Sequence, residues 1–184
     1  MIAKTALILG PSGGIGGEML RQLVAQGWKV RALKRGLGAA YRVAEGVEWI
    51  EGDAMNAQDV GRASEGCSVI VHAVNPPGYR GWGQQVLPMI DNTIAAAAAQ
   101  GATIVLPGTV YNFGPDAFPV LHEDSLQRPL TRKGKIRVEM EKRLRDASER
   151  GNVRVIVVRA GDFFGPGARN NWLSQGMITP ARCR

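Results

Sequence analysis

The chain has 184 residues, of which 45% are hydrophobic, and a formal net charge of +7. This length favours one domain with a substantial core, and the absence of an apolar run of about 18 residues argues against a membrane-spanning helix. Two cysteines without a C-x-x-C pair exclude a disulfide framework and indicate no metal site. Because the start of the sequence shows no cleavable signal pattern, we expect a cytoplasmic protein.

Apolar runs of strand length alternate with longer helical patterns along the chain. This alternation is typical of βαβ units and predicts an α/β fold, a Rossmann-type doubly wound parallel sheet with helices on both faces. The predicted strands are Thr5–Leu9, Lys29–Leu33, Glu48–Glu51, Val69–Ala73, Thr103–Leu106 and Val153–Arg159. The predicted helices are Gly14–Gln26, Asn56–Ser64, Gln84–Gln100 and Arg132–Arg150. Residues 75–83 and 108–129 show no clear period and are interpreted as loops that shape a site.

The segment between the first strand and the first helix is rich in glycine and contains G-x-x-G-x-x-G. Glycines here permit a tight turn and close approach of a pyrophosphate, while the helix N-terminus supplies amides and a positive dipole. Its position directly after a strand and before a helix is the context that this motif requires. We therefore expect residues 1–167 to bind a nicotinamide dinucleotide; the alternative is a glycine-rich turn without a ligand. The expected phosphate-binding residues are Gly10, Ser12, Gly13, Gly14, Ile15 and Gly16.

Two basic residues, Lys34 and Arg35, follow the second predicted strand. Dinucleotide-binding folds that prefer NAD usually place an acidic residue here for the ribose hydroxyls, and an acid would repel a 2′-phosphate. A guanidinium can pair with that phosphate through two parallel hydrogen bonds. This favours NADP over NAD as the cofactor; the alternative is a pair of ordinary surface cations.

Much of the basic excess lies between residues 128 and 150, where acidic side chains are interleaved with it. Pairs such as Glu139 with Arg143 and Glu141 with Arg145 have the i, i+4 spacing that stabilises a helix. The pattern indicates a solvated helix face. Since no nucleic-acid motif accompanies the charge, we expect no nucleic-acid partner, and a nucleic-acid-binding protein is only a third interpretation.

Further segments, in chain order, carry a resemblance that extends over nearly the whole chain. They are Glu51-Gly52-Asp53-Ala54, Val71-His72-Ala73-Val74-Asn75, Val110-Tyr111 with Gly114, and the stretch from Arg159 to Gly165-Pro166-Gly167. Together with the glycine loop they resemble the short-chain dehydrogenase/reductase superfamily, in particular the atypical and extended NAD(P)-dependent epimerases and dehydratases. The resemblance implies hydride transfer with a carbonyl compound or a sugar nucleotide. It places Asp53 and Ala54 at the adenine, and Ala73, Val74 and Asn75 beside the cofactor ribose.

The resemblance also implies a catalytic triad of Ser or Thr, Tyr and Lys, which this chain matches only in part. The lysine falls on Lys135, which would hold the nicotinamide ribose, whereas the tyrosine position holds Thr131 and the Ser/Thr position holds Pro107. Thr109 and Tyr111 lie close by and are the other candidate hydroxyls. A threonine hydroxyl is several pKa units less acidic than a tyrosine, whose pKa is about 10. A non-catalytic NADP-binding module or redox sensor is therefore the competing interpretation.

Members of the extended branch generally continue well past the G-P-G segment into a smaller substrate domain. Here only residues 168–184 follow, without a strand or helix period. The resemblance implies that most of the substrate domain is missing and that this tail is a remnant of it. By analogy with the family, the helices Gln84–Gln100 and Arg132–Arg150 are candidates for a homodimer interface.

Overall fold

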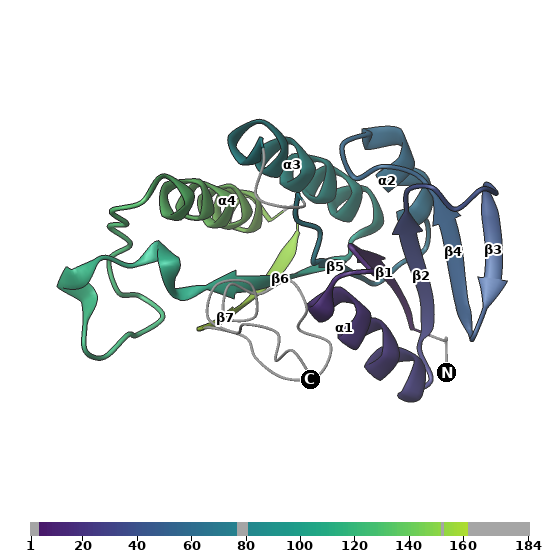
Figure 1. The fold of residues 1–184 in the computed structure, drawn as a ribbon, viewed down its shortest axis with the longest axis horizontal. Helices are drawn as coiled ribbons and strands as arrows, with labels where there is room; N and C mark the ends of the chain where they lie inside the picture. Colours follow the sequence, from purple (N-terminus) through teal and green to yellow (C-terminus); the bar gives the residue numbers. More distant parts are fainter. Residues whose placement is uncertain (1–3, 77–80, 152, 162–184) are drawn as a thin grey trace, which may run out of the picture.

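The computed structural model describes residues 4–76, 81–151 and 153–161, which form one sheet with helices on both sides (Figure 1). The strand order is β3-β4-β2-β1-β5-β6-β7, and all neighbouring strands are parallel except β3 and β4. The strands are β1 (Thr5–Leu9), β2 (Lys29–Lys34), β3 (Tyr41–Ala44), β4 (Val47–Glu51), β5 (Val69–His72), β6 (Thr103–Thr109) and β7 (Arg154–Ala160). The helices are α1 (Gly14–Ala25), α2 (Ala57–Ser64), α3 (Trp82–Gln100) and α4 (Arg132–Glu149).

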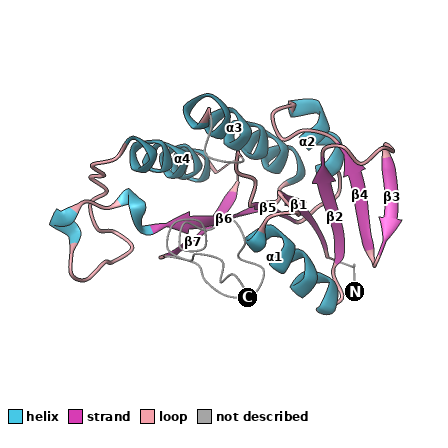
Figure 2. Ribbon diagram, viewed as in Figure 1, coloured by secondary structure: helices cyan, strands magenta, loops and turns pink. Residues whose placement is uncertain are grey.

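The helices divide between the two faces of the sheet, with α1 on one face and α2, α3 and α4 on the other (Figure 2). Successive residues of β1 point to opposite faces, so Leu7 and Leu9 enter the core under α2 to α4 while Ile8 enters the core under α1. All of these side chains are fully buried. The predicted Rossmann-type doubly wound α/β sheet is therefore confirmed.

The antiparallel strand β3 is the one strand in the described residues that the apolar pattern does not predict. It is an exposed edge strand of four residues, too short to show an apolar face. The two residues between β3 and β4, Glu45 and Gly46, have φ of 54° and 76°. Two successive positive φ angles are typical of a type I′ hairpin turn; in the sequence only the glycine at its second position pointed to it.

The other boundaries differ from the prediction by only a few residues. Strand β6 continues past Leu106 to Thr109, and α3 begins at Trp82. Two short 3-10 turns, Val110–Asn112 and Pro115–Ala117, interrupt the predicted loop over residues 108–129. Residues 162–184, which include the end of the G-P-G segment and the predicted tail, lie outside the described residues. No helix in the described part is long and apolar enough to cross a membrane.

Helix α4 confirms one predicted ion pair and corrects another. Arg143 Nε lies 2.9 Å from Glu139 Oε1, as the spacing predicts. Glu141, however, is buried and pairs with Arg159 of β7 at 2.8 Å instead of with Arg145. The prediction was wrong because position 141 lies on the buried side of α4 beside Met140 and Leu144, which the charge spacing alone does not reveal.

His72 is a core residue at the end of β5, as expected from its place in a buried strand. Its side chain is 2% exposed, and Nδ1 lies 2.8 Å from Thr93 Oγ1. Because the Thr93 hydroxyl donates to the Met89 carbonyl, the ring donates from Nδ1. Burial lowers the pKa of His72 to about 3, and the nearby charge of Arg137 contributes in the same direction. The ring is therefore neutral at pH 7.

This histidine should make the stability of the fold depend on pH. Its folded pKa lies below the unfolded value of 6.5, so the unfolded state takes up the proton first. The stabilisation is present above pH 6.5 and is lost as the pH falls towards 3. We expect this residue to account for a loss of about 2 kcal/mol of unfolding free energy between pH 7 and pH 5.

Denaturant unfolding at both pH values measures this loss. The variant His72→Gln should lose that part of the pH dependence, whereas His122→Gln, which replaces an exposed histidine, should retain it. An unchanged pH profile in His72→Gln would contradict the assignment.

Candidate functional site

The predicted cofactor-binding residues come together at one edge of the sheet. Strands β1, β2, β4 and β5 are parallel, so their carboxyl ends lie along the same edge. Gly10 follows β1, Arg35 follows β2, Asp53 follows β4 and Ala73 follows β5. In open α/β sheets ligands bind outside the carboxyl ends of the strands, and this edge is therefore the candidate site.

The glycine loop packs directly on the end of β5. Gly10 has a φ of 84°, and a Cβ atom there would lie 2.6 Å from the Ala73 carbonyl oxygen. A Cβ on Gly16 would lie 2.2 Å from the Gly10 carbonyl oxygen. A Cβ on Gly13 would lie 3.4 Å from the same oxygen, which is an ordinary van der Waals distance. Gly10 and Gly16, the first and third glycines of the motif, therefore lie where the backbone packs too closely for a Cβ atom. Gly13 lies where a Cβ atom would fit.

The start of α1 is open to an incoming ligand. Gly13 is the N-cap residue, and no side chain caps the helix. Ser12, Gly13 and Gly14 are exposed, while Ile15 is half-buried. The first amides of a helix have no intrahelical partner, and a helix of this length directs positive potential at them. This uncapped, exposed terminus fits a pyrophosphate.

The structure gives the two basic residues at the end of β2 different surroundings. The Lys34 ammonium lies over the Trp49 ring, 5.7 Å from its centroid. Arg35 lies at the edge, with Nη1 3.4 Å from Asp53 Oδ2; the Arg35 side chain is well exposed and the Asp53 side chain is partly exposed. Such an exposed pair contributes little stability. Arg35 is therefore the better placed of the two cations to contact a ligand at this edge.

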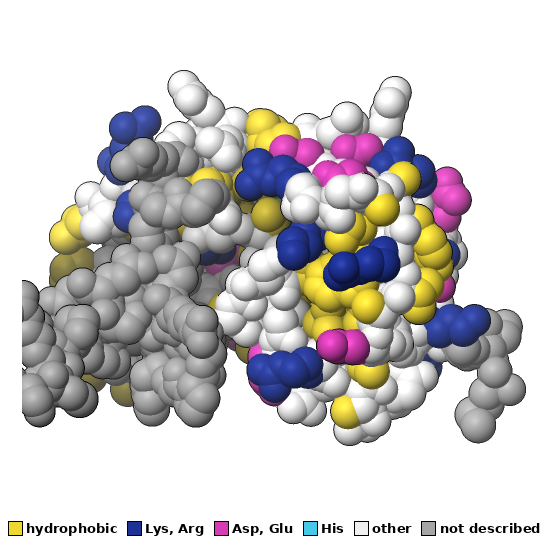
Figure 3. Space-filling model, turned by 45° about the vertical axis from the view of Figure 1, so that its right-hand side comes forward, with side chains coloured by type: hydrophobic (Ala, Val, Ile, Leu, Met, Phe, Trp, Pro, Cys, Tyr) yellow, Lys and Arg dark blue, Asp and Glu magenta, His cyan; other side chains and the backbone are white. Residues whose placement is uncertain are grey.

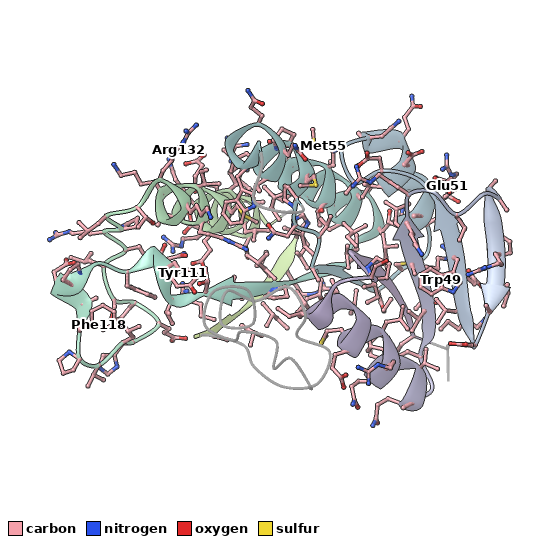
Figure 4. All side chains as sticks on the ribbon, in the orientation of Figure 1. Trp49, Glu51, Met55, Tyr111, Phe118 and Arg132 are labelled. Carbon is pink, nitrogen blue, oxygen red and sulfur yellow. The ribbon has the colours of Figure 1, made fainter. Side chains whose placement is uncertain are left out.

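Glu51 is a residue of this edge to which the sequence analysis assigned no role of its own. It ends β4 (Figure 4) and pairs in register with Lys34 of β2. Glu51 Oε1 accepts a hydrogen bond of 2.9 Å from the Gly36 amide, and Oε2 accepts one from the Leu37 amide. Its carboxylate therefore binds the two amides directly after Arg35. The signal in the sequence for such a role was an acidic residue at the end of a predicted strand; that this strand lies next to β2 comes from the structure.

The remaining predicted cofactor residues have different environments. Ala54 is buried, and its carbonyl accepts a 2.9 Å hydrogen bond from Asn92 of α3, so it anchors the turn after β4. Ala73 and Val74 are half-buried against the glycine loop, and Asn75 is exposed. Their backbone forms the wall of the edge next to the glycine loop.

The candidate catalytic residues gather where β6 ends and α4 begins. A Cβ on Gly134 would lie 2.5 Å from the Tyr111 carbonyl oxygen, so the turn after β6 packs on the first turn of α4. Tyr111, labelled in Figure 4, is 51% exposed, and Lys135 of α4 is also exposed. The fold therefore brings the segments that carry these two side chains to one region.

The two candidate threonines both have structural hydrogen bonds. The Thr131 hydroxyl accepts a 3.0 Å hydrogen bond from the Gly134 amide and forms the N-cap of α4. The Thr109 hydroxyl is nearly buried and accepts a 3.2 Å bond from the Tyr111 amide. Capping by itself accounts for a threonine at both positions, whatever its chemistry. In the described ranges no group of three His, Cys, Asp or Glu side chains could hold a metal ion.

A groove of about 730 Å³ lies between α4, β7 and the loop before α4. It is lined in part by Lys142 and Arg145 of α4 and by Arg159 of β7, and none of the predicted cofactor residues contributes to it. The residues assigned to the dinucleotide thus lie along an open edge of the sheet and not in this groove.

Comparison with known proteins gives a family match over most of the chain. Residues 10–161 match the family described as NAD(P)H-binding. Over 92 residues, half of this chain, the sequence is 30% identical to the 2-alkyl-3-oxoalkanoate reductase of Shewanella oneidensis, and the match covers 23% of that protein.

Solved structures share the fold at low sequence identity. The UDP-glucose 4-epimerase from Brucella ovis in complex with NAD has a TM-score of 0.74 at 16% identity, covering 87% of this chain and 52% of that one. MoeE5 in complex with UDP-glucose and NAD has a TM-score of 0.74 at 24% identity, covering 93% and 59%. The chain therefore spans little more than half the length of these structural relatives.

The tight glycine contacts predict a difference between two substitutions. Gly16→Ala should destabilise the fold by about 2 kcal/mol or more, because its methyl group would overlap the Gly10 carbonyl oxygen. Gly13→Ala should cost less than about 1 kcal/mol, since its methyl group meets ordinary space. Equilibrium unfolding in urea measures both. Equal stability of the two variants would show that the glycine loop does not pack as described.

Proposed function

The chain belongs to the NAD(P)H-binding family, and on that premise we propose that it binds NADP in preference to NAD at the carboxyl edge of the sheet. The observation that supports this preference is Arg35, an exposed guanidinium next to Asp53 at the end of β2. The uncapped start of α1 would hold the pyrophosphate, Asp53 the adenine, and Lys135 the nicotinamide ribose. When bound, the nicotinamide supplies hydride transfer.

We also propose that the protein is an atypical epimerase-like or reductase-like member of the family, acting on a carbonyl compound or a sugar nucleotide. A non-catalytic NADP-binding module is the second candidate, and one observation favours it: the Thr131 hydroxyl is the N-cap of α4. Pro107, at the usual Ser/Thr position, has no hydroxyl. The cytoplasmic location and the homodimer remain predictions.

Binding measurements test the cofactor preference. One charge-assisted contact contributes about 1.5 to 3 kcal/mol, so NADPH should bind roughly tenfold to a hundredfold more tightly than NADH. Arg35→Ala should remove most of this preference, and Lys34→Ala should remove less because Lys34 lies over Trp49. Parallel calorimetric titrations with both cofactors measure the effect.

Arg42→Ala is the matched control, because Arg42 is exposed on β3 and is not among the residues assigned to the cofactor. It should retain the preference of the wild type. Equal affinity of the wild type for NADPH and NADH would contradict the proposed preference, and binding of neither would contradict the function.

Turnover measurements test the chemistry. We expect little or no NADPH oxidation on ordinary carbonyl and sugar-nucleotide substrates, because Thr131 and Pro107 cannot replace the usual acid-base hydroxyls. Positioned acid-base catalysis commonly contributes about 10²- to 10⁴-fold in rate. The double variant Thr131→Tyr with Pro107→Ser should increase turnover, although losing the N-cap costs it about 1 kcal/mol of stability. NADPH absorbance in a broad substrate screen measures the rate.

Tyr111→Phe distinguishes the remaining outcomes. Fast wild-type turnover that this variant abolishes would identify Tyr111 as the acid. Fast turnover that it leaves unchanged would mean that a different donor or a different reaction is involved.

A further inference from the structure

The backbone after Arg35 forms a small anion-binding turn that Glu51 occupies. Gly36 has a φ of 69°, and the successive amides of Gly36 and Leu37 both donate to the Glu51 carboxylate. Successive amides in such a turn form a concavity that binds anions. In dinucleotide-binding folds the 2′ position of the adenosine ribose lies near the end of the second strand, and this turn follows β2 directly after Arg35.

The charges at this edge are balanced within the protein. Lys34 and Arg35 carry two positive charges, and their neighbours Glu51 and Asp53 carry two negative charges. On the side of the molecule that includes β2, β4 and β3, basic and acidic side chains are interspersed around apolar ones (Figure 3). An entering phosphate therefore meets two cations together with two carboxylates, and not a site of net positive charge.

We propose that Glu51 is a specificity-determining residue of the dinucleotide site, one that limits the preference for NADP. Its carboxylate occupies the two amides that a 2′-phosphate would otherwise bind, and it repels that phosphate. A 2′-hydroxyl meets no such repulsion, so Glu51 leaves the affinity for NADH unaffected. This inference rests on the proposed function, since it assumes that the ribose lies at this edge.

The variant Glu51→Gln separates the charge from the shape. The carboxamide has nearly the same size and retains an oxygen that can accept one of the two amide hydrogen bonds, but it has no negative charge. We expect NADPH to bind about tenfold more tightly to this variant, the factor that about 1.4 kcal/mol of relieved repulsion produces. NADH affinity should stay within about twofold. The fragments 2′,5′-ADP and 5′-AMP should reproduce the same contrast.

The matched control is Glu48→Gln, which removes the same charge from the same strand. Glu48 pairs with Arg31 at 2.9 Å, and because it lies three positions before Glu51 along β4, it points to the opposite face of the sheet. It should leave the ratio of NADPH to NADH affinity unchanged. A rise in the ratio in both variants would show a general effect of net charge and would overturn the role of Glu51.

The amides of Gly36 and Leu37 provide a second measurement that needs no variant. In wild-type protein, NADPH should shift their nuclear magnetic resonance signals more than NADH does, because only the 2′-phosphate competes with Glu51. Equal shifts would overturn the proposal even if Glu51→Gln did not fold.

The outcomes separate this inference from the proposed function. If Glu51→Gln gains NADPH affinity while the wild type shows no preference, the inference holds and the proposed preference of the wild type fails. If the wild type prefers NADPH and Glu51→Gln leaves the ratio unchanged, the inference fails and the proposed preference holds. If neither dinucleotide binds, both fail.

Discussion

The close backbone contact between the glycine loop and the end of β5 is the constraint on which the rest of the site depends. Gly10 approaches Ala73 and Val74 so closely that a Cβ atom has no space, and Gly16 approaches Gly10 in the same way. These contacts place the first turn of α1 directly above the ends of β1 and β5. The amides at the helix start then open onto the same edge as Arg35 and Asp53, which makes this edge the candidate site for a dinucleotide.

Buried and half-buried carboxylates determine how the loops around this edge are held. Glu51 binds the loop after β2 through two backbone amides, and Glu141 binds Arg159 of β7 and Gln127 of the loop before α4. A carboxylate that is 4% exposed needs such partners, because an unpaired buried charge costs several kcal/mol. The same pairing links α4, β7 and the loop, and so supports the region that carries Tyr111 and Lys135.

The region around α4 shows what the threonine at position 131 does for the fold. A threonine at position 131 caps the helix through its hydroxyl, which a tyrosine could not do in the same geometry. The turn that carries Tyr111 packs on α4 through Gly134, so the capped first turn of α4 is held against the end of β6. The fold at this position therefore needs the threonine only as a helix cap.

Local patterns in the sequence determined most of the fold and the position of the glycine loop. Strand and helix periods, and glycines between a strand and a helix, express constraints within a few residues, so they can be recognised without the partner elements. The partners of Glu51, Glu141 and Lys34 could not be recognised in this way. They depend on which strands are neighbours, on their register and on which face of a helix is buried, and only the tertiary structure decided these, because residues far apart in the chain meet only when the sheet is assembled.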